Sequence, residues 1–481
     1  MKPGLASILV VFSVPALSLA AAEKPNIILV MADDQGWGDM AYNGHAVLKT
    51  PNFDASAAAG LRFDRFYAAA PVCSPTRAGV MTGRHPNRMG VFQWGYPMRP
   101  QETTVAEALK GAGYATAHFG KWHLGSVRRN SPAHPGRNGF DAWLSAPNFF
   151  DNNAILSREG TAVQTRGESS MVTVDAALEW ITARAKSDRP FLAVVWFGSP
   201  HSPHRAVDRD RALYKDQPGR LQNFYGEVTG MDRAYGKLRN ALGPLGIRDN
   251  TLLWYTSDNG ALRRVGSTGG RRGHKGQVYD GGLAVPAIIE WPDRIPEPRT
   301  TAIRANSCDV YPTLLEIAGV TVENQPPLDG ISLVGVIDGK QNRRLRPMGF
   351  WHYRIGGIST PSAKWMAELL KAQQDGGDLE PHESSRVAAR LPVKRYPSER
   401  FPGHAAWIAG DWKLHRIERP DGTVRWEFYN LADDPGERTD RILGKDESTR
   451  VSRMKRDLRT WLKSVVGSLN GDDYPAKSFE R

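Results

Sequence analysis

The chain has only two cysteines among its 481 residues, Cys73 and Cys308, so a disulfide scaffold is excluded. Two reduced cytosolic thiols would explain the same count, so it does not indicate a cellular compartment. Internal repeats and low-complexity segments are also lacking. Hydrophobic residues make up 40% and charged residues 24%, which is typical of a globular chain and not of a disordered one. The length fits about two or three domains, or one large α/β unit with a smaller partner.

Acidic residues are the minority charge, with 51 Asp and Glu against 63 Lys and Arg, for a net charge of +12. This excess favours anionic substrates. The basic residues are dispersed, and neither a basic arm nor a zinc-finger pattern accompanies them. We therefore expect no nucleic-acid partner.

Long apolar runs are absent except at the N-terminus, where Lys2 precedes the run Leu5–Leu19 and Ala20–Ala22 follow it. A basic start, a short apolar core and small residues are typical of a secretory signal peptide. The run is shorter than the roughly 20 residues that a membrane-spanning helix needs. We expect residues 1–22 to be a signal peptide, the protein to be periplasmic or secreted, and no stable membrane anchor to remain.

Apolar runs and helical patterns alternate along residues 23–345. The predicted buried strands are Pro25–Ala32, Phe191–Phe197, Thr251–Thr256 and Val285–Glu290, and the predicted helices are Thr104–Ala112, Met171–Ala185 and Phe224–Leu242. This alternation indicates an α/β domain with a largely parallel sheet flanked by helices.

Three of these strands end in polar residues, namely Asp33-Asp34, Gly198–His201 and Ser257–Asn259. In open α/β sheets, ligands bind at the carboxyl ends of the strands. The sequence therefore predicts a functional site at this edge of the sheet.

The composition changes beyond about Arg344. Residues 346–403 are rich in Gly, Pro and charge and lack a clear period, so we predict an insertion or linker there. Three short strands follow, at residues 405–409, 412–416 and 425–429, with hairpin signals at Gly410-Asp411 and Pro420–Gly422. With an amphipathic helix over Ser448–Val466, they predict a C-terminal α+β subdomain over residues 404–481.

The most informative motif is Cys73-Ser74-Pro75-Thr76-Arg77, with Met81–Arg84 directly downstream. It resembles the C-x-P-x-R motif of the formylglycine-dependent sulfatases, the type I sulfatases of the alkaline phosphatase superfamily. The other interpretation is a buried structural cysteine near a helix start. Several further family-like segments in the same order, up to Glu427–Glu437, favour the sulfatases. The resemblance implies an alkaline-phosphatase-like α/β fold with a smaller C-terminal antiparallel sheet and helix.

The resemblance also implies a covalent mechanism. A formylglycine-generating enzyme would oxidise Cys73 to 3-oxoalanine, and one hydroxyl of its hydrate would attack sulfur while the other expels sulfate. Arg77 lies one helical turn beyond, on the same predicted face, where it would hold the hydrate.

Two strand-end pairs, Asp33-Asp34 and Asp258-Asn259, look like metal ligands. Carboxylate and amide oxygens suit Ca²⁺, and Mg²⁺ less well. Each pair alone would fit a turn or a helix cap equally well. The family uses matching positions for calcium, with the side chain of residue 73 at the same centre.

Four further residues match the family pattern. Lys121 and His123 are two residues apart, so in an extended segment both would point toward sulfate and the hydrated aldehyde; a solvated lysine beside a packed histidine is the alternative. The resemblance places His201 on the leaving-group side and Lys275 on sulfate. We interpret Cys308 as a buried apolar residue and leave His204 as structural or adjacent to substrate.

These residues predict an exported, calcium-dependent sulfuric ester hydrolase, with sulfated carbohydrate as the favoured substrate class. A phosphonate or phosphate ester hydrolase of the same superfamily remains an alternative, as does a catalytically dead protein that binds sulfated glycans. Aromatic and basic residues of Val91–Met98 and 352–403 are candidates for lining the substrate pocket. The sequence does not indicate the oligomeric state.

Overall fold

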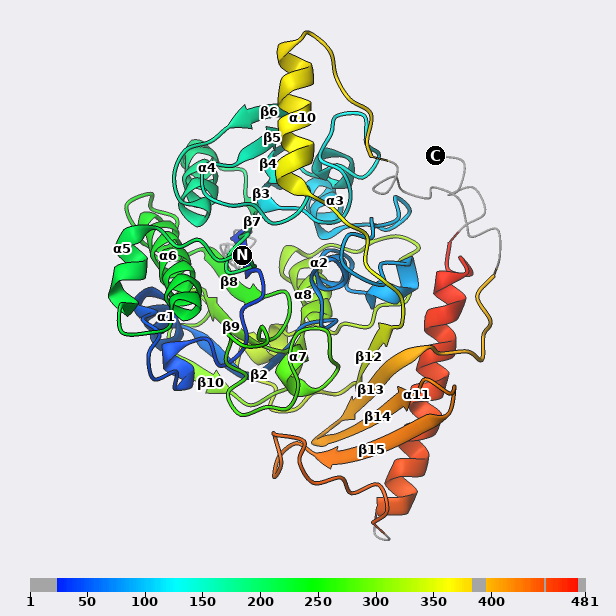
Figure 1. Cartoon of the computed structure of the whole chain (residues 1–481). Helices are drawn as coiled ribbons and strands as arrows, with labels where there is room; N and C mark the ends of the chain where they lie inside the picture. The colour runs from blue at the N-terminus through cyan, green and yellow to red at the C-terminus, as the bar shows by residue number, and fades with distance from the viewer. Residues whose placement is uncertain (1–23, 383–394, 445–446, 475–481) are drawn as a thin grey trace, which may run out of the picture.

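The computed structural model describes residues 24–382, 395–444 and 447–474 (Figure 1). The predicted signal peptide, residues 1–22, lies outside these ranges and stays a prediction. Within the described ranges, we find no helix with both the length and the apolar character that crossing a membrane requires.

An eleven-stranded sheet forms the centre of the large domain, in the order β10-β2-β9-β8-β1-β7-β3-β4-β5-β6, with β11 beside β2 (Figure 1). Its strands are β1 (Asn26–Ala32), β2 (Leu61–Tyr67), β3 (Ala115–Lys121), β4 (Ala142–Ala146), β5 (Ile155–Arg158), β6 (Thr161–Gln164), β7 (Phe191–Trp196), β8 (Thr251–Ser257), β9 (Ala284–Glu290), β10 (Arg299–Thr301) and β11 (Ala305–Asn306). Strands β8, β1, β7, β3 and β4 are parallel, whereas β9 is antiparallel to β8 and to β2. The predicted α/β class with a mostly parallel sheet is confirmed.

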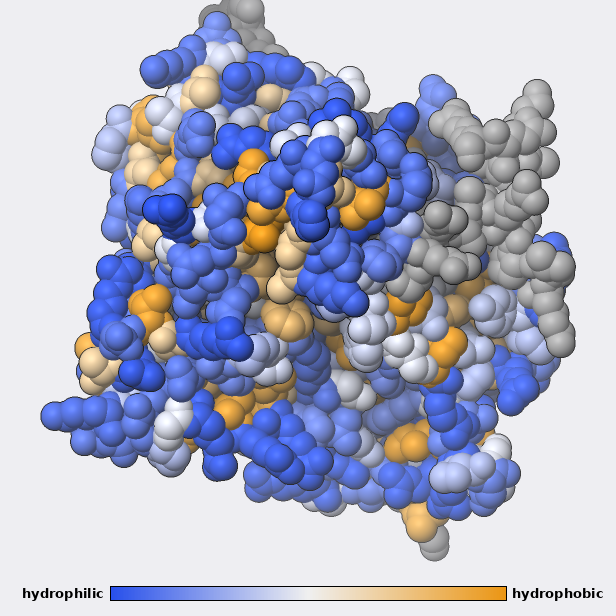
Figure 2. All heavy atoms as spheres, turned by 45° about the horizontal axis from the view of Figure 1, so that its top comes forward, coloured by the Kyte–Doolittle hydropathy of each residue, from blue (hydrophilic) through white to orange (hydrophobic). Residues whose placement is uncertain are grey.

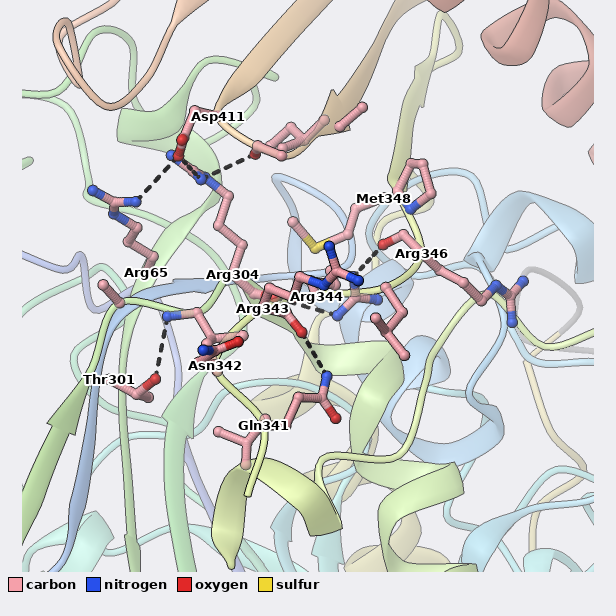
Figure 3. Close-up of a pocket in the computed structure, with 18 of the residues that line it drawn as sticks. Arg65, Thr301, Arg304, Gln341, Asn342, Arg343, Arg344, Arg346, Met348 and Asp411 are labelled. Atoms are coloured by element: carbon pink, nitrogen blue, oxygen red, sulfur yellow. Dashed lines mark hydrogen bonds and ion pairs between the residues drawn. The ribbon is translucent and has the colours of Figure 1, made fainter. Parts of the chain in front are cut away.

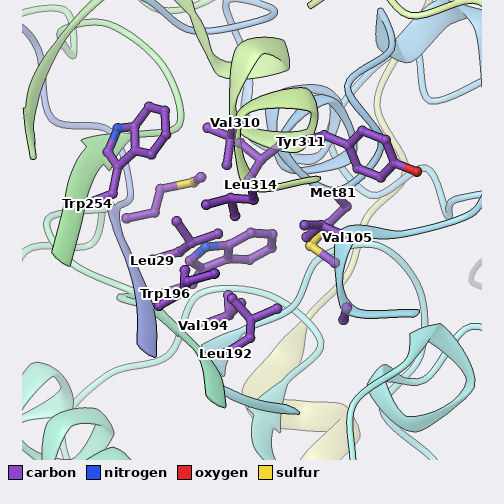
Figure 4. Close-up of a cluster of buried hydrophobic side chains, with 14 of the residues drawn as sticks. Leu29, Met81, Val105, Leu192, Val194, Trp196, Trp254, Val310, Tyr311 and Leu314 are labelled. Carbon is purple, nitrogen blue, oxygen red and sulfur yellow. The ribbon is translucent and has the colours of Figure 1, made fainter. Parts of the chain in front are cut away.

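The central strands are apolar throughout because both faces of the sheet are covered. Successive residues point to opposite faces, so Leu29 of β1 joins the core on one face and Val30 the core on the other. Figure 4 shows the first of these cores, where Leu29, Trp196 and Trp254 of the sheet pack against Met81 and Leu314 of the covering helices.

Helices cover both faces of this sheet. They are α1 (Pro51–Ala59), α2 (Cys73–Thr82), α3 (Val105–Gly111), α4 (Ser169–Arg184), α5 (Asp208–Arg211), α6 (Gly219–Ala241), α7 (Asp280–Leu283), α8 (Val310–Ala318) and α9 (Val334–Ile337). Helices α2, α3 and α8 contribute to the core in Figure 4, and α1, α4 and α6 to the core on the other face. The three helices predicted from the sequence are α3, α4 and α6, and α6 begins five residues before its predicted start at residue 224.

A four-stranded antiparallel sheet and a long helix form the C-terminal subdomain. Its elements are β12 (Met348–Tyr353), β13 (Gly403–Ala409), β14 (Trp412–Glu418), β15 (Val424–Asn430) and α11 (Ser448–Leu469). The two predicted hairpins and the amphipathic helix are confirmed, since β13, β14 and β15 pair in sequence and α11 buries one face against them.

The predicted insertion or linker over residues 346–403 contains two regular elements. Strand β12 pairs along its whole length with β13 and so belongs to the C-terminal sheet. Helix α10 (Ser362–Gln374) lies beside β5 and β6 and buries Met366 and Leu369 in the core of the large domain (Figure 1). Its apolar stripe is short, and the Gly- and Pro-rich stretches on either side hide the helical period. Residues 383–394 lie outside the described ranges.

Candidate active site

The carboxyl ends of four parallel strands carry the predicted site residues. Asp33 and Asp34 follow β1, Asp258 and Asn259 follow β8, Lys121 ends β3, and His201 follows β7. Because these strands are parallel neighbours, their ends meet at one edge of the sheet. Cys73, the first residue of α2, reaches the same place, since its sulfur and one oxygen each of Asp33 and Asp258 lie within 4.8 Å of one another.

The backbone at Asp34 explains how two adjacent carboxylates reach one centre. Side chains of neighbouring residues in a strand point to opposite faces, but β1 ends at Ala32 and Asp34 adopts the left-handed conformation, with φ of 72°. The Asp34 amide donates to Oδ1 of Asp258 at 3.0 Å, which ties the two strand ends together.

Each of the three buried carboxylates has its own cationic partner. Lys121 Nζ lies 2.6 Å from Asp33, Arg77 Nη2 2.7 Å from Asp258, and Lys275 Nζ 2.5 Å from Asp34. Three positive side chains therefore balance three carboxylates in a site from which water is largely excluded. Arg77 is fixed further, because Nη1 donates to the Lys121 carbonyl and its guanidinium lies over the Trp196 ring.

Three acceptor oxygens in this cluster have no hydrogen-bond partner within the described residues: Asp33 Oδ1, Asp34 Oδ2 and Asn259 Oδ1. Asn259 Nδ2 donates to Asp34 Oδ1 at 2.9 Å, which leaves the amide oxygen as the free atom. Buried polar atoms in folded proteins are almost always paired. A set of unpaired carboxylate and amide oxygens fits a hard divalent cation such as Ca²⁺.

Burial and neighbouring charges act in opposite directions on the carboxylates of the cluster. Burial raises the pKa of Asp33, against the opposing charge of Lys121. Burial also acts to raise the pKa of Asp34, but the charges of Lys275 and His201 bring it below its usual value. Burial raises the pKa of the Cys73 thiol, so the unmodified side chain is held as a neutral thiol and not as a thiolate nucleophile.

His201 faces the Asp34 carboxylate, with Nε2 3.6 Å from Oδ2. Its ring stacks on Phe149 at 4.1 Å between centroids, and Nδ1 donates to the Ser202 carbonyl at 2.6 Å. These contacts fix the ring orientation, and burial lowers the pKa of His201 to about 3. His204 Nε2 donates to the Pro200 carbonyl at 3.0 Å.

The predicted extended segment from Lys121 to His123 is wrong. Strand β3 ends at Lys121, and His123 has φ of 55°, so the two side chains do not share a strand face. His123 is nevertheless buried near the cluster, where its Nε2 hydrogen-bonds Thr360 Oγ1 at 3.2 Å.

Thr360 and Asn148 were missed by sequence reasoning. Asn148 Nδ2 donates to Thr360 Oγ1 at 2.8 Å, so Thr360 links Asn148 to His123. Thr360 lies between β12 and α10, in a Gly- and Pro-rich stretch without a helical or strand period. The only signal in the sequence was its position within residues 352–403, which we suggested as a pocket-lining segment. The other suggested segment lies beside it, since the Ile358 amide donates to the Trp94 carbonyl.

The loop that carries Lys275 is held by the C-terminal subdomain. Gly273 and Gly276 flank it with φ of 81° and 85°, and the Lys275 amide donates to the Ala261 carbonyl at 2.9 Å. Just downstream, Asp280 lies 2.6 Å from Nζ of the fully buried Lys413 on β14. Lys413 also lies 3.1 Å from Glu437, whose other oxygen accepts from the Asp280 amide. A buried ion network thus joins the two domains beside this loop.

Cys308 is buried, as predicted. It lies away from the cluster beside Gly79 of α2, where a Cβ added to that glycine would meet its sulfur at 3.2 Å. Its role as a small apolar residue is confirmed.

Comparison with known proteins identifies the family. The family model Sulfatase matches residues 25–320, so the chain belongs to the sulfatase family and has an alkaline-phosphatase-like fold. Sulfatases are sulfuric ester hydrolases, and this chain is therefore an enzyme of that class.

Particular relatives cover most of the chain. N-acetylgalactosamine-6-sulfatase of Canis lupus familiaris is 34% identical over 388 residues, which are 72% of this chain and 72% of the relative. Arylsulfatase A of Homo sapiens is 32% identical over 435 residues, covering 81% of this chain and 84% of the relative. The crystal structure of Ps i-CgsB is 25% identical with a TM-score of 0.76, covering 92% and 93% of the two chains.

Removing the Lys413 ammonium tests the interdomain network. Lys413→Met leaves Asp280 and Glu437 buried without their cation, so we expect the free energy of unfolding to fall by about 3–5 kcal/mol. Urea denaturation at pH 7 measures this change. Lys340→Met is the matched control, because Lys340 forms an exposed pair with Asp338 and its loss costs about 1 kcal/mol or less. Equal effects of the two substitutions would contradict the proposed importance of the network.

The difference in unfolding free energy between wild type and Lys413→Met should depend on pH in one direction. Burial acts to lower the pKa of Lys413, but Asp280 and Glu437 raise it above its usual 10.5. Its stabilising contribution is therefore complete below pH 10.5 and declines as the pH rises through the folded-state pKa. The gap in unfolding free energy between wild type and Lys413→Met should stay constant from about pH 7 to about pH 10.5 and narrow as the pH rises further.

Proposed function

We propose that this sulfatase hydrolyses sulfate esters on carbohydrates, with residue 73 as nucleophile and one Ca²⁺ at the carboxylate cluster. The observation that carries the proposal is the convergence of Cys73 with Asp33 and Asp258 beside three cationic side chains. The named substrate of the N-acetylgalactosamine-6-sulfatase relative supports a sulfated sugar. We also propose export through residues 1–22.

Cys73 is proposed to be matured to formylglycine by a formylglycine-generating enzyme. One hydroxyl of the hydrated aldehyde would lose its proton and bond to sulfur as the ester S–O bond breaks and the alcohol leaves. The second hydroxyl would then lose its proton, and the aldehyde would re-form as its C–O bond to sulfate breaks. The buried neutral thiol supports this need for modification, since a thiol with a raised pKa is a weak nucleophile at neutral pH. Arg77, on the same helix, is proposed to orient residue 73.

Asp33, Asp34, Asp258 and Asn259 are proposed to hold the calcium ion, together with the side chain of residue 73. When bound there, the ion would supply positive charge that offsets the carboxylates and would polarise a sulfate oxygen. The three unpaired buried oxygens support this ligand set. Mg²⁺ suits it less well, because Mg²⁺ usually keeps several water ligands.

Lys121 and Lys275 are proposed to bind the sulfate oxygens, and His123 to hydrogen-bond the hydrate. Both ammonium groups lie at the carboxylate cluster, where each can hold a tetrahedral anion as a compact point charge. His201 is proposed to stabilise or protonate the departing alkoxide in its protonated form, which the negative charge of bound sulfate would favour against the lowering effect of burial on its pKa. Its stacking on Phe149 supports this role, because it keeps the ring in one orientation.

Substitution of the nucleophile tests the proposed function. Cys73→Ala should reduce kcat for an aryl sulfate by at least about a thousand-fold, with a melting temperature close to that of the wild type. Cys308→Ala is the control, and it should retain activity because Cys308 lies outside the cluster. Normal turnover by the Cys73→Ala protein would contradict the mechanism.

Comparing matched sulfate and phosphate monoesters in the same assays distinguishes a sulfatase from a phosphate or phosphonate ester hydrolase and from a catalytically dead binding protein. We expect the higher kcat/KM for the sulfate ester. A preference for phosphate would instead favour a phosphate or phosphonate ester hydrolase. Tight binding of a sulfated glycan by the matured protein without any turnover would favour a catalytically dead binding protein.

Removal of calcium gives an independent test with a readout besides activity. Chelation and dialysis should lower both activity and melting temperature, and Ca²⁺ at about 100 times its Kd should restore about 2.7 kcal/mol of stability. Asp258→Asn should lose this stabilisation, whereas Asp249→Asn, at an exposed position before β8, should keep it. An unchanged melting temperature after chelation and dialysis would contradict the calcium site.

A further inference from the structure

An arginine-rich groove lies at the β10 edge of the large sheet (Figure 3). It has a volume of about 740 Å³, and its walls come from β10, the loop of residues 339–348 and the Gly410-Asp411 turn of the C-terminal sheet. Strands β2, β9 and β8 separate β10 from β1, and none of the lining residues belongs to the candidate active site. We call this feature the arginine groove.

The charge of the arginine groove is strongly positive. Asp411 is the single acidic residue in its lining. Six arginines line the groove: Arg65, Arg299, Arg304, Arg343, Arg344 and Arg346. Asp411 is contacted by Arg304 at 2.5 Å and Arg65 at 3.4 Å, and Asp309 behind the wall pairs with Arg344 at 2.6 Å. Two carboxylates for six guanidinium groups leave four positive charges uncompensated.

The arginines without a carboxylate partner donate to backbone carbonyls or are exposed to solvent at the groove. Arg299 donates to the carbonyls of Val336 and Ile337, and Arg346 donates to the Leu328 carbonyl, bonds that orient a guanidinium without neutralising it. Arg343 and Arg346 are exposed, and neither forms an ion pair with a carboxylate of the described chain. The groove therefore presents guanidinium groups that no carboxylate of the described chain neutralises.

This arrangement suits a ligand that carries several sulfate groups. The guanidinium fork matches two oxygens of a sulfate group and is more weakly hydrated than an ammonium group. Arginines spread along one groove favour a chain with repeated anionic groups over a single small anion. Thr300, Gln341 and Asn342 add neutral hydrogen-bonding groups that suit sugar hydroxyls.

We propose that the arginine groove binds a sulfated glycan chain and holds a polymeric substrate on the enzyme while a sulfate group is hydrolysed at the separate active site. Tethering raises the local concentration of the scissile ester, so it should lower KM for polymers without changing the chemical step. The choice of a sulfated glycan rests on the proposed function, whereas the anionic character of the ligand rests on the groove itself.

Charge reversal at the two exposed arginines tests the proposal. The groove pair is the double variant Arg343→Glu/Arg346→Glu. The control pair, Arg453→Glu/Arg456→Glu, changes the net charge by the same amount on the exposed face of α11. Binding of chondroitin sulfate is measured with both pairs in the full chain carrying Cys73→Ala, so that turnover does not interfere. We expect at least about ten-fold weaker binding for the groove pair and less than about two-fold for the control pair. Chemically desulfated polymer, which keeps only its carboxylates, should bind at least about ten-fold more weakly.

Kinetics of the two double variants with Cys73 intact complete the test. The groove pair should raise KM for the sulfated polymer several-fold and leave kcat/KM for a sulfated monosaccharide unchanged. Unchanged polymer binding, or an equal loss in the control pair, would overturn the proposal. Equal affinity for polyphosphate of similar length would overturn the assignment to sulfated glycan. If the groove pair binds polymer like the wild type while the enzyme still hydrolyses the monosaccharide, only the groove proposal is refuted. If polymer binding depends on the groove but no sulfate ester is hydrolysed, only the proposed function is refuted.

Discussion

Three carboxylates that are buried within one small volume impose the main constraint on this structure. Asp33, Asp34 and Asp258 are fully buried, and unpaired charges in such a place would cost far more free energy than a fold can supply. Each therefore meets a lysine or arginine from another part of the chain. The parallel strands, the start of α2 and the Lys275 loop are held in positions that make these pairs possible.

The C-terminal subdomain supports the loop that supplies Lys275 to this cluster. Its sheet contributes Lys413 to a second buried ion network, which fixes the backbone just beyond Lys275. The Gly410-Asp411 turn of the same sheet closes one wall of the arginine groove. One small domain thus stabilises the loop of a proposed sulfate-binding lysine and helps to form a second anionic-ligand site.

Much of this architecture could be predicted from local sequence signals. The runs Pro25–Ala32 and Thr251–Thr256 are apolar at every position, as strands covered on both faces must be, and the polar residues after them mark the edge where the site forms. The Cys73 motif predicted the family that the comparisons confirm. Helix α10 was missed because its apolar stripe is short, and Thr360 because hydrogen bonds between distant residues leave no periodic signal. The backbone turn at His123 was likewise invisible, since an extended segment and a left-handed residue can share the same sequence.

The chemical state of residue 73 in protein isolated from its native host tests the central claim most directly. Mass spectrometry of the peptide spanning Cys73 should show an aldehyde in place of the thiol in protein that hydrolyses sulfate esters. A fully active preparation in which that peptide carries only the unmodified thiol would contradict the account, because the buried, neutral sulfur would then have to act without the proposed nucleophile.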